Sequence, residues 1–174
     1  EVLKQPGQFA WQVFDSKVSK LLRSEYRIKF MTKVSATTLE DLARNRDALL
    51  NMGAPSPRTH AYPYGETKPQ VKDNLPPRLM SARGILPGLN VGATDLAQLR
   101  AYPLFGDGGM ERIMKALKVA AKRKAWVIGF THDVAETPSP WGTRSDELEA
   151  LLSEARKLGF VVLPVTAALE RRLA

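Results

Sequence analysis

The sequence predicts an α/β protein built around a parallel β-sheet. Segments with helical periodicity alternate along the chain with short apolar segments. The clearest of these, AWVIGFTHDV at residues 125–134, is an almost unbroken apolar run, as is typical of a strand buried on both faces. Because parallel strands need a crossover connection, the alternation indicates helices packed on the sheet.

The first half of the chain predicts three helices and two strands. Residues 1–13 predict no regular element. In order, we expect a helix at 15–24, a strand at 27–34, a helix at 37–50, a proline-rich loop at 54–65, a broken helix at 68–79 and a strand at 80–84. Thr37 and Glu40 form a capping-box pattern at the start of the second helix, and Gly53 is suited to end it.

The second half is more regular. In order, we expect a loop at 86–92, a helical turn at 95–100, a strand or turn at 101–104, a helix at 110–124, the strand at 125–134, a helix beginning near Thr143 or Ser145 and ending at 158, a strand at 160–164 and a helix at 167–173. The helix at 110–124 carries apolar residues at i, i+3, i+4 and i+7, which predicts one buried face.

Length and composition favour one globular domain covering residues 1–174. The chain has no cysteine, which excludes disulfides and thiolate metal sites. No apolar run approaches the roughly 20 residues that span a bilayer. The chain begins at Glu1 without a recognisable signal peptide, so we expect a processed, engineered or partial N-terminus.

The formal net charge of +8 favours contact with polyanions such as nucleic acid, anionic glycan or a membrane surface. Much of this charge lies on one predicted helix, at Lys115, Lys118, Lys122, Arg123 and Lys124. These residues form either a solvated helix face or a binding patch. No aromatic residue is interleaved with them, as single-stranded nucleic-acid sites usually require, which favours the solvated face.

His132 and Asp133 directly follow the buried strand and are the leading candidates for chemistry. In α/β sheets, ligands bind beyond the carboxyl ends of the strands. An imidazole there can act as general acid or base, or can simply cap the strand end by bonding to the backbone. His60, the second histidine, is interpreted as structural.

Two further side chains allow two interpretations each. Trp141 lies between Pro140 and Gly142, where it can stack on a sugar ring or fold over the sheet edge. Arg83 lies at the end of a predicted strand and can orient a carboxylate or form a structural salt bridge. The chain lacks a double-histidine metal spacing and a G-x-S-x-G nucleophile elbow, so a zinc site would need carboxylates such as Asp133.

Three segments resemble the polysaccharide deacetylases of carbohydrate esterase family 4, the NodB-homology domain. They are AYPYG at 61–65, SARGILPGLN at 81–90 and FTHDVAETPSPWG at 130–142, and the similarity extends over residues 15–169, after an N-terminal extension at 1–14. The resemblance implies a distorted (β/α) barrel. It also implies metal-dependent removal of acetyl groups from glycans, with zinc or another divalent ion activating a water.

The resemblance also assigns roles to individual residues. His132 matches the acid that protonates the leaving group, Tyr64 matches the residue whose backbone N–H stabilises the oxyanion, and Arg83 loosely matches a conserved arginine of the active site. Tyr62, Trp141 and Asp133 are the candidate substrate-binding residues.

The sequence departs from the family at the metal site. Met31 and Ser35 occupy the positions of the two metal-binding histidines, and thioether and hydroxyl are poor zinc ligands. No TFDD motif occurs; Phe14, Asp15 and Ser16 imitate it, which we interpret as accidental. The barrel is therefore expected to lack its first strand.

Three functional hypotheses follow. The chain is a deacetylase-like domain that binds glycan with little or no hydrolysis, a deacetylase completed by a missing segment or partner, or a basic module that binds nucleic acid or another polyanion. Because a missing strand would expose a sheet edge, we also expect a homodimer or a partner chain that completes the sheet.

Overall fold

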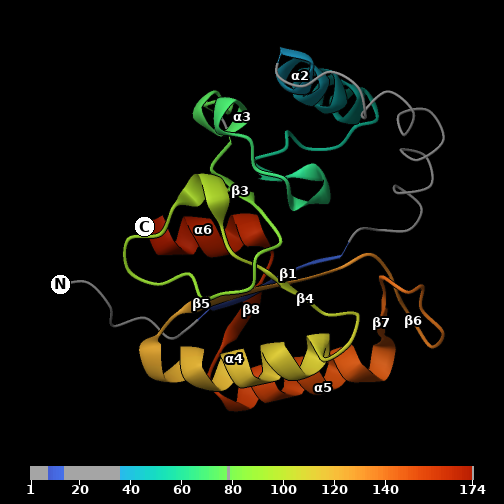
Figure 1. The fold of residues 1–174 in the computed structure, drawn as a ribbon, viewed down its shortest axis with the longest axis vertical. Coiled ribbons are helices and arrows are strands. Elements are labelled where there is room, and N and C mark those ends of the chain that lie inside the picture. The colour runs from blue at the N-terminus through green and yellow to red at the C-terminus, as the bar shows by residue number, and fades with distance from the viewer. Residues whose placement is uncertain (1–7, 14–35, 78, 174) are drawn as a thin grey trace.

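A four-stranded parallel sheet organises the molecule, with strand order β4-β5-β1-β8 (Figure 1). The structure is a computed structural model that describes residues 8–13, 36–77 and 79–173. The four strands are β1 (Gln8–Val13), β4 (Tyr102–Pro103), β5 (Trp126–Thr131) and β8 (Val161–Leu163). All three pairings are parallel, which confirms the predicted α/β class and places the carboxyl ends of the strands along one edge.

Strand β1 lies in the middle of this sheet, between β5 and β8. Two expectations are therefore wrong: that residues 1–13 form no regular element, and that the sheet lacks the strand contributed by the N-terminal part of the chain. The register pairs Gln8 with Trp126 and Val13 with Thr131, so β1 and β5 end at the same level. A homodimer was expected because a missing strand would expose a sheet edge. Since β1 is present between β5 and β8, this reason no longer applies.

The predicted (β/α) barrel is also wrong. In the described part of the chain, β4 and β8 are the outer strands and do not pair with each other. The remaining strands form two separate parallel pairs, β2 (Thr59–Ala61) with β3 (Ser81–Arg83), and β6 (Val134–Ala135) with β7 (Thr143–Arg144). A barrel requires its outermost strands to hydrogen-bond to each other, so this open sheet is not one.

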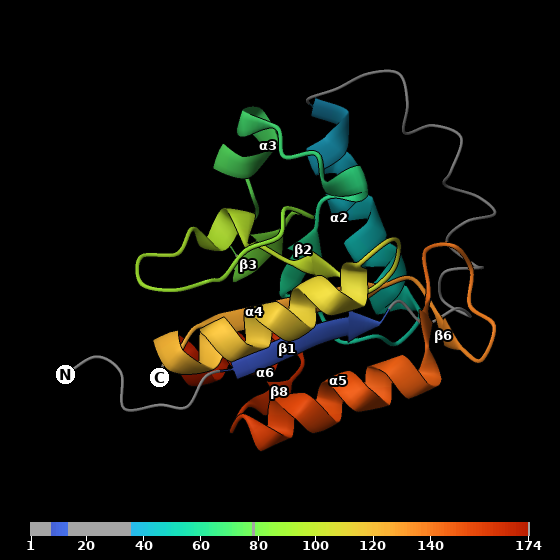
Figure 2. The same ribbon diagram turned by 60° about the horizontal axis from the view of Figure 1, so that its bottom comes forward.

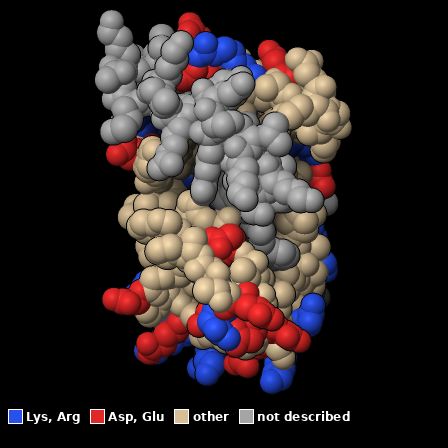
Figure 3. Space-filling model, turned by 90° about the vertical axis from the view of Figure 1, so that its right-hand side faces the viewer, with Lys and Arg blue, Asp and Glu red and all other residues tan. Residues whose placement is uncertain are grey.

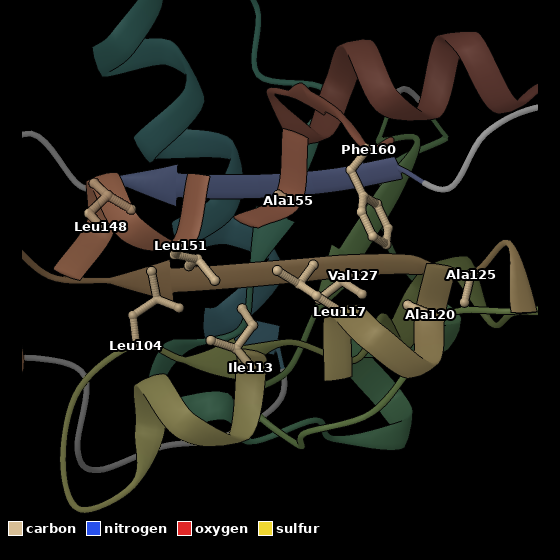
Figure 4. Close-up of a cluster of buried hydrophobic side chains, with 10 residues drawn as sticks. All are labelled: Leu104, Ile113, Leu117, Ala120, Ala125, Val127, Leu148, Leu151, Ala155 and Phe160. Carbon is tan, nitrogen blue, oxygen red and sulfur yellow. The ribbon is translucent and has the colours of Figure 1, made fainter. Parts of the chain in front are cut away.

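Helices cover both faces of the sheet. Side chains alternate along β5, so Val127 faces one side and Trp126, Ile128 and Phe130 face the other. Val127 packs with residues of α4 (Gly109–Arg123) and α5 (Ser145–Lys157), as Figure 4 shows. The opposite face packs on α6 (Val165–Leu173), whereas in a barrel the side chains of the strands fill the equivalent space.

The remaining elements lie on the α6 side of the sheet, across it from α4 and α5 (Figures 1 and 2). They are the β2-β3 pair, the helices α2 (Ala36–Asn51) and α3 (Pro69–Asp73), and the short turns η1 (Pro63–Gly65) and η2 (Leu96–Gln98). Main-chain hydrogen bonds connect the segment between β3 and η2 to the sheet, since the Asn90 amide donates to the Trp126 carbonyl and the Trp126 amide donates to the Asn90 carbonyl, both at 2.9 Å.

Most predicted helices are confirmed within two or three residues. Helix α2 ends where Gly53 adopts a left-handed φ of 80°, and α5 is followed by Gly159 with a φ of 81°. The predicted helix at 15–24 and strand at 27–34 lie outside the described residues, as do Phe14, Asp15, Ser16, Met31 and Ser35. None of the helices in the described part combines the length and apolar character needed to cross a membrane.

Candidate functional site at the carboxyl end of β5

Four ring side chains meet where β5 ends, and we call them the ring cluster: Phe105, Phe130, His132 and Trp141. Phe105 is at its centre. The Phe105 ring centroid lies 5.6 Å from that of Phe130, 5.5 Å from that of His132 and 5.7 Å from that of Trp141, each in an edge-to-face arrangement. These separations fall in the favourable range for aromatic pairs.

Phe105 was not identified from the sequence. It lies two residues after β4, the strand that pairs with β5, and the Leu104 amide donates to the Phe130 carbonyl at 3.0 Å. The pairing of β4 with β5 therefore brings Phe105 next to Phe130 and His132. The sequence does show an aromatic residue directly after the strand-like segment 101–104. It does not show which other strand this segment pairs with, so the position of Phe105 could not be predicted.

Arg83 reaches the ring cluster from the β2-β3 pair. Its guanidinium carbon lies 4.6 Å from the centroid of Phe130, and its Nη1 donates to the Gly84 carbonyl at 3.2 Å. The side chain is buried, and this burial lowers the Arg83 pKa to about 10, which leaves the group charged at neutral pH. The geometry is that of a cation held over an aromatic face.

Asp133 organises the loop that follows it. Its carboxylate accepts a hydrogen bond from the Ser139 amide at 2.9 Å and another from the Ser139 hydroxyl at 2.5 Å. Its carbonyl accepts from the Thr143 amide at 3.0 Å and from the Thr131 hydroxyl at 3.1 Å. The structure thus gives Asp133 a loop-fixing role beside the substrate-binding role that the resemblance implied.

Trp141 is exposed but its backbone is fixed. Its carbonyl accepts from the His132 amide at 3.1 Å, and its own amide donates to the Ser139 hydroxyl at 3.3 Å. Its side chain is 62% exposed, with one edge on Phe105. The loop therefore presents a large ring to solvent directly beside His132.

Gly142 provides a test of this loop. A Cβ added at Gly142 would lie 2.5 Å from Oδ1 and 2.7 Å from Oδ2 of Asp133, so Gly142→Ala must displace the carboxylate that holds Ser139. We expect faster hydrogen exchange across residues 134–142 and a loss of about 1–2 kcal/mol in unfolding free energy. Ser139→Ala removes the two hydrogen bonds of the hydroxyl, to Asp133 and from the Trp141 amide, but keeps the bond from the Ser139 amide to Asp133, so we expect a smaller change in the same segment. Unchanged exchange in both variants would contradict the loop-fixing role.

Three other sequence candidates lie outside the ring cluster. Tyr62 is buried and donates its hydroxyl to the Ala97 carbonyl at 2.8 Å, and burial raises its pKa to about 12. Tyr64 is 75% exposed with a left-handed φ of 55°, an uncommon conformation for a residue with a side chain. His60 packs edge-to-face on Tyr62 at 5.2 Å, which is consistent with its structural interpretation.

The described residues do not fit a zinc centre. They contain no group of three or more histidine, aspartate or glutamate side chains able to hold a metal ion, and both Asp133 oxygens face Ser139 donors. Met31 and Ser35 lie outside the described residues.

The basic residues of α4 lie on its exposed side. Lys115 pairs with Glu111 one turn earlier, at 2.6 Å. On the face drawn in Figure 3, acidic and basic side chains are intermingled over the lower end of the molecule. For α4 itself, exposed charges with an i,i+4 ion pair are typical of a solvated helix face.

The three segments that resemble the deacetylase motifs each begin in a β-strand. Residues 61–65 begin at the end of β2, residues 81–90 contain β3, and residues 130–142 join the end of β5 to the loop that Asp133 fixes. No family model, curated protein or solved structure matches this chain. The contacts at the ring cluster are therefore the main evidence on function, and the motif resemblance is a second support.

Proposed function

We propose that this chain is a polysaccharide-deacetylase-like domain that binds a glycan at the ring cluster without hydrolysing it. The observation that carries this proposal is Trp141, a large exposed ring whose backbone is held by His132 and Ser139. The C–H face of a sugar is apolar and slightly positive, so it stacks on the electron-rich face of an indole.

Neighbouring groups supply the polar part of such a site. His132 lies beside Trp141 at the end of β5, and ligand sites of parallel sheets form at this edge. An imidazole can donate to or accept from a sugar hydroxyl. Binding rather than hydrolysis is proposed because Met31 and Ser35 occupy the positions that the resemblance assigns to the two metal-binding histidines, and their side chains are poor zinc ligands.

The first test is Trp141→Ala, measured by calorimetric titration with acetylated chitooligosaccharides and xylooligosaccharides. We expect the affinity to fall about tenfold, since a stacking contact contributes about 1–1.5 kcal/mol. Val119→Ala is the matched control, because Val119 is an exposed apolar residue on α4, 49% exposed, and its removal should leave binding unchanged. Equal affinities of the wild type and Trp141→Ala would contradict the proposal.

Two further measurements separate the alternatives. Acetate release from the same oligosaccharides, abolished in His132→Gln, would establish hydrolysis and replace the binding-only proposal. Tight RNA binding that falls steeply with salt, without glycan affinity, would favour the polyanion module. We expect neither result.

A further inference from the structure

We propose that a second pocket, formed by the segment between β3 and β4, binds a small hydroxylated carboxylate. The pocket has a volume of about 440 Å³. Residues that line it include Thr67, Gly84, Asn90, Asp95, Gln98 and Arg100. The segment 84–98 and the β6-β7 loop lie at opposite sides of the molecule in Figures 1 and 2, so this pocket is separate from the ring cluster.

Arg100 supplies a positive charge to the pocket. Its guanidinium Nη1 has one long hydrogen bond, 3.4 Å to the Pro87 carbonyl, and it forms no ion pair with an acidic side chain of the described residues. The carboxylate of Asp95, the acidic residue of the lining, pairs instead with Lys72 and accepts from the Ala97 amide. An anionic ligand is therefore favoured over a cationic one.

The backbone at Arg100 is fixed in advance. The Arg100 amide donates to Oδ1 of Asn90 at 3.0 Å, and Nδ2 of Asn90 donates to the Arg100 carbonyl at 2.9 Å. Gly88 leaves room for the side chain, since a Cβ there would lie 2.3 Å from the Arg100 Cδ. A guanidinium on a fixed backbone is well suited to bind a carboxylate through two parallel hydrogen bonds.

Thr67 supplies a neutral polar contact. Its hydroxyl is buried and has no hydrogen-bond partner among the described residues, and it lies 3.9 Å from the position of a Cβ built on Gly84. Burying a hydroxyl without a partner costs free energy, which a ligand hydroxyl would recover. The Gln98 amide offers a second polar group in the lining.

The lining also contains the hydroxyl residue Thr94 and the apolar residues Leu86, Leu89, Val91 and Leu99. This combination of one cation, hydroxyl and amide groups and an apolar wall suits a sugar acid of monosaccharide size. The volume lies within the usual range of small-molecule sites. The inference does not rest on the glycan site at Trp141.

The test is calorimetric titration with D-glucuronate, with D-glucose as the neutral counterpart. We expect glucuronate to bind and Arg100→Gln to lose at least about tenfold in affinity, as the loss of a charge-assisted hydrogen bond predicts. Lys118→Gln removes the same charge from the exposed side of α4 and should bind as the wild type does. Trp141→Ala should also bind normally, which distinguishes this pocket from the ring cluster.

Thr67→Val separates ligand binding from folding. Because the Thr67 hydroxyl lacks a partner, we expect the variant to melt at the wild-type temperature or above it, while glucuronate affinity falls roughly fivefold. Gly88→Ala should weaken binding by displacing Arg100 without removing its charge. The proposal is overturned if glucuronate does not bind at millimolar concentration, if Arg100→Gln binds it equally well, or if glucose or inorganic phosphate binds more tightly.

Discussion

Replacing Phe130 with alanine is expected to lower the free energy of unfolding by about 3–5 kcal/mol, as is usual for a buried phenylalanine. Phe130 is 5% exposed and packs between the sheet and α6. Its ring also lies under the buried Arg83 guanidinium and against Phe105. The substitution therefore leaves a cavity and removes the contact that stabilises a buried cation.

Phe130→Leu is the control for this prediction. Leucine fills most of the volume but has no π face, so we expect a smaller loss of about 1–2 kcal/mol from the missing ring contacts. Urea denaturation followed by circular dichroism measures both variants. A loss below about 1 kcal/mol for Phe130→Ala would show that the ring does not belong to the core.

Acidification from pH 6.5 to pH 4 is expected to destabilise the protein through His60. Burial, with a smaller contribution from the positive charge of Arg83, lowers the His60 pKa in the folded state from 6.5 to about 4. Between these values the unfolded chain binds a proton that the folded chain does not. The contribution of neutral His60 to the free energy of unfolding is therefore complete above pH 6.5 and is lost as the pH falls towards 4. The total loss is about 3 kcal/mol.

His60→Phe isolates this contribution. Nε2 of His60 is buried without a hydrogen-bond partner among the described residues, so phenylalanine keeps the edge-to-face contact with Tyr62 and removes the titration. The difference in unfolding free energy between variant and wild type should rise by about 3 kcal/mol between pH 6.5 and 4. The His132→Gln variant keeps His60, so the part of the pH dependence of the unfolding free energy that comes from His60 should be the same as in the wild type. A constant difference would contradict the burial of the His60 Nε2 atom.

The local elements were predictable because their signals are local. The apolar stripe at 110–124 predicts α4, and the apolar run at 125–134 predicts β5 together with the polar residues that end it. These two predictions placed His132 and Asp133 at a strand end, where the structure also has them. Arg83 was identified in the same way, at the end of another predicted strand, and Trp141 was identified in the proline-containing loop that follows β5.

The functions of these side chains were not predictable from their positions. Asp133 holds its own loop through Ser139, and Phe105, which the sequence did not single out, contacts both His132 and Trp141. Such contacts depend on the conformation of a proline-containing loop and on strand pairing. Neither leaves a periodic signal in the sequence.

Sequence periodicity was sufficient to predict the α/β class, the positions of most helices, and the buried strand whose end carries His132. Periodicity determines these features because it reports which face of an element is buried. The tertiary structure alone decided that β1 fills the centre of the sheet, that no barrel closes in the described part, and that Phe105 joins the site. Those outcomes depend on which distant segments pair, and pairing is selected by the free energy of packing over the whole domain.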